Sequence, residues 1–283
     1  MEEHFFIYNG LLFESGTPLL DEKNRAFKYG DGLFETMRIY QGNLINGGFH
    51  FERFFKGLSL LKIPVTPPFS EAILRQNIQT LLEENSIETH ARVRLMAFRG
   101  GNSLLGEAGE APGYILEVTG TEAPILLNDR GLKVEVFADS KKSGDLFSNV
   151  KTNNYLSSIM AMLYAQENQM DECFLLNASG RICESAISNV FIIHRNKLIT
   201  PPLSEGGIAG VVRRWLIENL HHMGREVEEK TLSIEDVWAA DEIFLTNSLK
   251  WVRWVKEFRG KFYSNEKTSQ IAQFAFRKMT DST

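Results

Sequence analysis

The first half of the chain alternates short apolar and polar blocks, and these blocks predict an α+β fold. Two apolar runs flank Asn9-Gly10, a pair that favours a tight hairpin turn because both residues tolerate positive φ. Beyond it, apolar residues recur with the period of strands, then of helices, then of strands again. The predicted strands cover 5–8, 11–13, a pair over 33–45, 91–98 and 114–118, and the predicted helices cover 49–61 and 70–85.

A stretch of small and polar residues, Gly120–Pro124, predicts a linker between two domains that span 1–119 and 125–283. The second half again mixes strand and helix patterns, and a glycine-rich loop precedes one of the helices. Its predicted strands cover 132–137, 173–176, 190–193 and 243–246, and its predicted helices cover 154–168, 211–222 and the tail from 267.

Composition and charge argue against several classes of function. The formal net charge is -5, whereas a nucleic-acid-binding protein normally carries a basic stripe. No apolar run approaches the length that crosses a bilayer, and the acidic start Met1-Glu2-Glu3 does not resemble a signal peptide. Cys173 and Cys183 lack the spacing of a metal site or disulfide framework. We expect a cytoplasmic protein without a nucleic-acid or membrane partner, with both cysteines buried as small hydrophobic residues.

Lys151 and Glu184 are weak signals when each is taken alone. Lys151 lies in a polar segment ahead of a predicted helix, where most lysines are solvated surface charges. A lysine that bonds covalently to a carbonyl group must be partly desolvated, which position alone does not show. Glu184 lies at a strand end among small polar residues, between two apolar strands. That pattern fits a carboxylate beside a ligand, and it also fits a turn or helix-capping acid.

The glycine-rich loop Gly206–Gly210 enters the helix predicted from Val211. Backbone N–H groups and the helix dipole favour a phosphate at such a start, although the loop has neither the P-loop nor the GxGxxG pattern. An ordinary flexible loop is an equally good interpretation. Arg53, at another helix start, is either an anion clamp or a surface arginine paired with Glu52 or Glu71.

Arg92 and Arg94 alternate on a predicted strand, so both side chains extend from the same face. Two guanidinium groups on one face can bind a substrate carboxylate, or they can belong to an ordinary exposed strand face. His194 and the pair His221-His222 have no partners at metal-ligand spacing, so we predict no metal site.

Six segments, in one order between about Asn24 and Val255, resemble the class IV aminotransferases, which are the pyridoxal 5'-phosphate (PLP) enzymes of fold type IV. The segments are Tyr29–Arg38, His50–Arg53, Val150–Tyr155, Glu184–Phe191, Ile208–Arg213 and Phe244–Ser248. The family includes branched-chain and D-amino-acid aminotransferases and 4-amino-4-deoxychorismate lyase. The resemblance implies a homodimer of two-domain α+β chains, with PLP between the N-terminal domain and a C-terminal α/β domain.

The resemblance also implies roles for single residues. Lys151 corresponds to the lysine that binds PLP covalently and moves a proton on the substrate. Glu184 corresponds to the carboxylate that keeps the pyridine nitrogen protonated, and Tyr155 to a hydroxyl near the phenolic oxygen. The implied cofactor-binding set is Arg53, Lys151, Tyr155, Glu184, Ser188, Asn189, Gly210, Val211, Val212, Thr246, Asn247 and Ser248.

The substrate pocket that the family implies is formed by Tyr29, Phe34, Arg38, Arg92, Arg94 and Arg99. Arg94 and Tyr155 favour the branched-chain type, so amino-group transfer between an amino acid and a 2-oxo acid is the leading hypothesis. The alternative is a lyase that releases pyruvate and 4-aminobenzoate from 4-amino-4-deoxychorismate. Arg92 lies where branched-chain enzymes tend to have tyrosine, which argues against a purely apolar substrate. The pattern Gly30-Asp31-Gly32 and the pair Arg99-Gly100 are more similar to the lyase or to D-amino-acid enzymes. The extra arginines also suit a substrate with more than one carboxylate. The stretch 100–113 is expected to close the partner's site.

A third hypothesis is a non-catalytic relative that binds a ligand or a partner. The joint presence of the lysine, the glutamate, the arginine and the phosphate loop argues against it.

Overall fold

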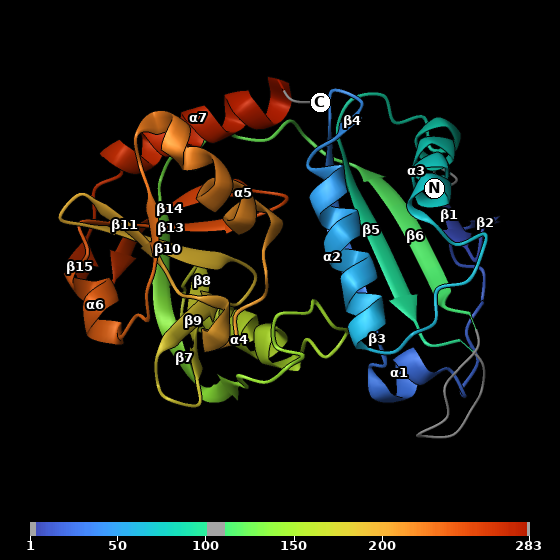
Figure 1. Cartoon of the computed structure of the whole chain (residues 1–283), viewed down its shortest axis with the longest axis horizontal. Coiled ribbons are helices and arrows are strands. Elements are labelled where there is room, and N and C mark those ends of the chain that lie inside the picture. The colour runs from blue at the N-terminus through green and yellow to red at the C-terminus, as the bar shows by residue number, and fades with distance from the viewer. Residues whose placement is uncertain (1–3, 101–110, 282–283) are drawn as a thin grey trace. The chain divides into compact units, whose positions relative to one another are not determined.

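The computed structural model describes residues 4–100 and 111–281 (Figure 1). The chain divides into two compact units, and each is considered by itself. The first unit contains the residues up to Ala123 together with Val150–Asn154, and the second contains Pro124–Asn149 and the residues from Tyr155 onward. Lys151 therefore belongs to the first unit. Most of the stretch 100–113, expected to reach a partner's site, lies outside the described residues.

The first unit is built on an antiparallel sheet that has, in its described part, the strand order β2-β1-β6-β5-β3-β4. The strands are β1 (Phe5–Tyr8), β2 (Leu11–Glu14), β3 (Gly32–Tyr40), β4 (Asn43–Leu44), β5 (Ala91–Phe98) and β6 (Gly113–Gly120). The helices are α1 (Arg25–Tyr29), α2 (Gly47–Leu60) and α3 (Glu71–Glu84). The predicted hairpin is confirmed: Asn9 and Gly10 have φ values of 50° and 85°.

Helices α2 and α3 cover one face of this sheet (Figure 1). Alternate residues of β3, such as Leu33 and Met37, are buried in a core with Phe51 and Phe54 of α2. The strand period then directs Phe34 and Arg38 to the opposite face. Strand β3 thus separates an apolar, helix-covered side from a side on which polar chemistry is possible.

The second unit contains a mixed sheet whose described strands follow the order β12-β11-β10-β13-β14-β7-β8-β9, with β15 beside β14. The strands are β7 (Leu132–Lys142), β8 (Glu172–Asn177), β9 (Ile182–Ser185), β10 (Asn189–His194), β11 (Lys197–Thr200), β12 (Val227–Glu229), β13 (Glu242–Asn247), β14 (Trp251–Phe258) and β15 (Lys261–Phe262). The helices are α4 (Leu156–Glu167), α5 (Val211–Asn219), α6 (Ile234–Ala239) and α7 (Glu266–Asp281), with 3-10 turns at Leu203–Glu205 and Leu220–Met223.

Helix α4 packs against β7 and β8 through small residues. Ala161 and Ala165 are buried with Phe137 and Leu175, so the helix axis can approach the sheet closely. The larger apolar residues of α4 point the other way: Leu156, Ile159, Met160 and Leu163 are all exposed. A helix that is apolar on its outer face as well as its inner one exposes a surface typical of an interface.

Both cysteines are buried in the second unit, and neither forms a disulfide with a described residue. Burial raises the pKa of each thiol to about 12, so both stay neutral. They are small hydrophobic residues of the core, as predicted. No helix in the described ranges is long and apolar enough to cross a membrane.

Candidate cofactor and substrate site

Lys151 lies in an extended segment that pairs with the start of β3. The Phe34 N–H donates to the Lys151 carbonyl at 2.9 Å, and the Asn153 N–H donates to the Gly32 carbonyl at 2.9 Å. Leu33 and Thr152 form the β-bridge between these bonds. The backbone of Lys151 is therefore fixed by a sheet, although its sequence reads as a loop. Lys151 is partly buried, as a lysine that bonds covalently to a carbonyl group must be. The sequence alone did not show this burial.

The side chain of Lys151 meets an arginine of the predicted pocket on one aromatic ring. The Lys151 ammonium lies 4.4 Å from the centroid of the Phe34 ring, and the Arg94 guanidinium carbon also lies 4.4 Å from it. Both contacts fall within the range of cation–π interactions. The structure thus brings together three of the predicted site residues, Lys151, Phe34 and Arg94.

Two more predicted arginines lie on the same face of the sheet. Arg38 of β3 and Arg92 of β5 stand directly opposite each other, two residues along from Thr36 and Arg94. Burial lowers the pKa of Arg38, and the Arg92 Nε is buried without a hydrogen-bond partner among the described residues. Like charges directly opposite on a sheet repel each other, so this pair favours an anion between them.

Arg99 and Tyr29 are placed differently from the other predicted pocket residues. Arg99 donates to the Asp31 carboxylate and to the carbonyls of Leu61 and Lys62, with Nε 2.9 Å from the Asp31 Oδ2. Arg25 donates to the same oxygen at 2.8 Å. Tyr29, at the end of α1, is 48% exposed. The donors of Arg99 therefore fix a turn beside β3.

Arg53 binds a carboxylate that the sequence did not indicate. Its Nε and Nη2 donate to the two oxygens of Glu35 at 2.7 Å and 2.6 Å, on the helix-covered face of β3. The Nδ1 of His50 lies 2.7 Å from the second of these oxygens. On the surface, Glu52 pairs with Lys56 and Glu71 pairs with Arg75.

Burial and charge decide the protonation of this group. Burial raises the pKa of Glu35, but Arg53 and His50 outweigh it and bring the pKa down to about 2. Burial also lowers the pKa of His50, so its neutral ring donates Nδ1–H to Glu35. The orientation of the Arg53 guanidinium is therefore fixed by an ionised, fully buried carboxylate.

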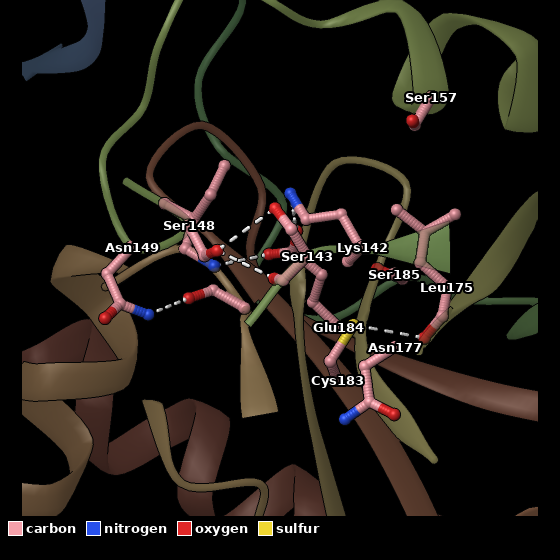
Figure 2. Close-up of polar contacts among 12 residues, drawn as sticks. Lys142, Ser143, Ser148, Asn149, Ser157, Leu175, Asn177, Cys183, Glu184 and Ser185 are labelled. Atoms are coloured by element: carbon pink, nitrogen blue, oxygen red, sulfur yellow. Dashed lines mark hydrogen bonds and ion pairs between the residues drawn. The ribbon is translucent and has the colours of Figure 1, made fainter. Parts of the chain in front are cut away.

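In the second unit, Glu184 of β9 is buried and both of its oxygens are bound (Figure 2). Lys142, the last residue of β7, places its ammonium 2.8 Å from Oε1. The Ile208 N–H donates to Oε2 at 2.8 Å. Sequence reasoning missed Lys142, because the strand pattern fades beyond 137. The carboxylate is held by a strand end on one side and by the glycine-rich loop on the other.

The glycines of that loop are required by close approach. A Cβ on Gly206 would lie 2.3 Å from the Ser143 carbonyl oxygen, and one on Gly207 would lie 2.7 Å from the Cys183 carbonyl oxygen. Asn149 holds the loop by donating to the carbonyls of Leu203 and Gly207 at 2.9 Å and 2.7 Å. The loop is therefore packed closely against the segments around it.

The start of α5 has the features of an anion cradle. Gly210 precedes the helix, no acid lies in its first turn, and a Cβ on Gly210 would lie 1.8 Å from the Asn189 Oδ1. The Thr246 Oγ1 is buried without a hydrogen-bond partner in the described chain, and Thr246 pairs with Asn189 across β10 and β13. A phosphate would supply the missing acceptor for the hydroxyl and for the amides of the first turn.

The other predicted cofactor residues of this unit lie around the same strands. Asn247 donates to the Ser188 hydroxyl at 3.1 Å, and Asn189 donates to the Ile208 carbonyl at 2.8 Å. Val211 and Val212 are the first residues of α5, Ser248 follows β13, and Tyr155 is the cap of α4. No cluster of three or more histidine, cysteine or acidic side chains within the described ranges could hold a metal ion.

A lysine beside arginines in the first unit and an anion cradle in the second unit are each features typical of enzymes that use a phosphorylated cofactor. The family model described as amino-transferase class IV matches residues 32–258, and the chain belongs to this family. The family depends on PLP, so the expected cofactor is confirmed, and its substrates are small molecules.

Relatives of this chain carry different activities in their names. A protein of Methanocaldococcus jannaschii, provisionally named a branched-chain-amino-acid aminotransferase, is 28% identical over 96% of this chain and 94% of its own length. The aminodeoxychorismate lyase of Vibrio harveyi is 28% identical over 86% of this chain and 88% of its own length.

A solved structure of the branched-chain aminotransferase of Thermoproteus uzoniensis matches with a TM-score of 0.90. It is 24% identical and covers 98% of this chain and 95% of its own. The structural match shows the fold, and the expectation of fold type IV is confirmed.

Proposed function

We propose that this enzyme transfers an amino group between an amino acid and a 2-oxo acid. The observation that carries the proposal is the shared position of the Lys151 amine and the Arg94 guanidinium on the Phe34 ring. In an amino acid the carboxylate is bonded to the carbon that reacts. A guanidinium that binds this carboxylate beside a basic amine presents the reacting carbon to that amine.

The roles of the residues follow from this placement. When bound, PLP withdraws electrons from the substrate's α-carbon and makes the hydrogen on it acidic. Lys151 attaches the cofactor and, as a free amine, removes that proton and returns it at the neighbouring position. Arg94 orients the carboxylate, and Phe34 fixes both cations relative to each other.

Residues of the second unit fit the remaining parts of PLP. Glu184 would contact the ring nitrogen, since it is a buried carboxylate already supported at both oxygens. The amides of Val211 and Val212, with Thr246, Asn247 and Ser248, would hold the phosphate. The buried Thr246 hydroxyl supports this, because it has no hydrogen-bond partner among the described residues.

The remaining predicted contacts complete the cofactor set. Arg53 would add a positive charge near the phosphate, and Tyr155 would donate to the phenolic oxygen of PLP. Ser188 and Asn189 would support the phosphate-binding residues through their hydrogen bonds with Asn247 and Ile208.

The lyase that releases pyruvate and 4-aminobenzoate is a second candidate. The opposed pair Arg38 and Arg92 favours it, because this pair suits a substrate with a further carboxylate beyond the one at Arg94. A lyase needs the same lysine and ring contact, so Lys151 and Glu184 serve either reaction.

The test combines chemical mapping with two assays. Borohydride reduction and peptide mass mapping should place the pyridoxyl group on Lys151; another lysine would overturn the assignment. Amino acids with 2-oxoglutarate should yield glutamate, whereas 4-aminobenzoate formed from 4-amino-4-deoxychorismate would establish the lyase.

Arg94→Met should raise KM for the amino acid by about tenfold to a hundredfold. Arg75→Met removes an arginine 4.9 Å from the Phe51 ring and should leave KM unchanged.

We also propose a homodimer located in the cytoplasm. The exposed apolar side of α4, with Leu156, Ile159, Met160 and Leu163, supports an interface with a second copy. The two thiol cysteines agree with a reducing compartment. Sedimentation equilibrium measures the first point, and a monomer at micromolar concentration would contradict it.

A further inference from the structure

The contact between Lys142 and Glu184 places a second cation at the carboxylate proposed for the ring nitrogen of PLP. The ammonium lies 2.8 Å from Oε1, and the two side chains are only 19% and 4% exposed. Figure 2 shows Lys142 reaching toward Glu184 from the end of β7, above the strand that carries Cys183 and Ser185. A pair this buried is screened very little by water or salt.

Glu184 is the charge that balances Lys142. The other titratable groups near the ammonium are Cys183 and Asp145. Cys183 is a neutral thiol, and the Oδ1 of Asp145 accepts from the Ser148 hydroxyl and the Phe147 N–H, both at 2.9 Å. Burial works against the ammonium, but Glu184 outweighs it, and the pKa of Lys142 lies above its ordinary value. Lys142 therefore stays charged at neutral pH.

The carboxylate keeps room for a third partner. Oε1 accepts from Lys142 and Oε2 accepts from the Ile208 N–H at 2.8 Å, and each carboxylate oxygen has two acceptor positions. The two contacts hold Glu184 from different elements, so its orientation does not depend on a bound ligand. A ring nitrogen can donate to the remaining positions without breaking either contact.

We propose that Lys142 is a positioning residue that keeps Glu184 ionised, so that a proton shared with the ring nitrogen of PLP stays on the nitrogen. This inference rests on the proposed contact between Glu184 and that nitrogen. The physical reason is distance. The ammonium touches the carboxylate directly, so it lowers the proton affinity of the carboxylate more than that of a nitrogen beyond it. Without Lys142, a buried carboxylate takes up a proton more readily.

The first experiment needs no cofactor. Infrared difference spectra of cofactor-free protein should show a carboxylic-acid band near neutral pH in Lys142→Met that the parent protein and Lys142→Arg lack. The band should vanish in the double variant Lys142→Met with Glu184→Gln, which assigns it. Lys142→Gln, which keeps a donor without the charge, replaces Lys142→Met if that variant does not fold. If Glu184 stays ionised in the neutral variants, the proposal is overturned.

The second experiment uses PLP labelled with nitrogen-15 in the ring and records the chemical shift of that nitrogen. Glu184→Gln should move the shift toward the value of an unprotonated ring, Lys142→Met should move it part of the way, and Lys142→Arg should leave it unchanged. No response to Glu184→Gln would overturn the ring contact, while the infrared titration still reports on Lys142. A response to Glu184→Gln but none to Lys142→Met would overturn the role of Lys142 alone.

Discussion

The two units hold charged groups by different physical means. In the first unit, side chains hold side chains: Glu35 fixes Arg53, and Asp31 fixes Arg25 and Arg99. In the second unit, the loop before α5 is held by close backbone approaches together with the amide side chains of Asn149 and Asn189. Its glycines allow approaches that a Cβ would block, and a main-chain N–H at Ile208 binds the key carboxylate.

This difference corresponds to a division of labour. A guanidinium on a strand can be exchanged for another side chain without changing the fold, which suits a surface that selects among substrates. A loop built on glycine contacts tolerates little change, which suits a group shared by all family members. The relatives in this one family are named for different activities, a branched-chain-amino-acid aminotransferase and an aminodeoxychorismate lyase.

The largest expected effect is that of Lys151→Ala, which removes the amine that the first unit contributes to the proposed site. Turnover should fall by at least about a thousandfold, because the group proposed to attach PLP and move the proton is lost. The fold should persist, since the carbonyl of residue 151 still accepts from the Phe34 N–H. Steady-state kinetics and circular dichroism measure both points. Lys250→Ala, at an exposed lysine, is the control, and activity within tenfold of the parent would contradict the assignment.

The next effect tests the buried carboxylate of the first unit. Glu35 has a folded-state pKa of about 2 against an ordinary 4.5, so it stabilises the protein above pH 4.5. The stability is lost as the pH falls from 4.5 toward 2, and the shift corresponds to about 3 kcal/mol. Glu35→Gln should therefore lower the free energy of unfolding by about 3 kcal/mol at neutral pH.

Urea unfolding at several pH values checks this prediction. The difference between Glu35→Gln and the parent should shrink steadily in acid. Glu71→Gln breaks an exposed pair with Arg75 and should cost less than about 0.5 kcal/mol at any pH. If both variants lost the same free energy of unfolding, the buried Glu35 would contribute no more stability than the exposed Glu71.

Much of the fold follows from residue periodicity, and the exceptions have physical causes. The hairpin of β1 and β2, the strand pair after Gly32 and helices α2 and α3 were predicted because their apolar residues keep one period. Strand β14 was not, since Arg253, Lys256 and Glu257 interrupt its alternation. Strand β7 extends to Lys142 through charged residues, so the sequence did not predict that Lys142 belongs to it.

The site shows the same limits. Lys151 and Glu184 were predicted as site residues only from the ordered segments around them, because neither residue is distinctive in isolation. Glu35 was missed, although one signal was present: it is an acid at an inward position between Leu33 and Met37 on an apolar strand face. An acid at such a position needs a cationic partner. Which partner it has depends on how α2 packs, and that is a tertiary contact.

The smallest of these effects tests the backbone side of the comparison. Gly210→Ala should lower the free energy of unfolding by about 1–3 kcal/mol, because its Cβ would lie 1.8 Å from the Asn189 Oδ1 and displace the bond from Asn189 to Ile208. Gly48→Ala in α2 is the control. Nothing lies within 4 Å of its Cβ position, and it should stabilise by about 0.5–1 kcal/mol.

Equilibrium dialysis with PLP then separates fold from function. If the loop binds the phosphate, Gly210→Ala should weaken PLP binding by about tenfold, the effect expected from losing one charge-assisted hydrogen bond, while Gly48→Ala leaves it unchanged. A Gly210→Ala protein that is less stable but binds PLP as tightly as the parent would mean that these glycines serve packing alone. The phosphate would then be held by side chains, and the contrast between the two units would disappear.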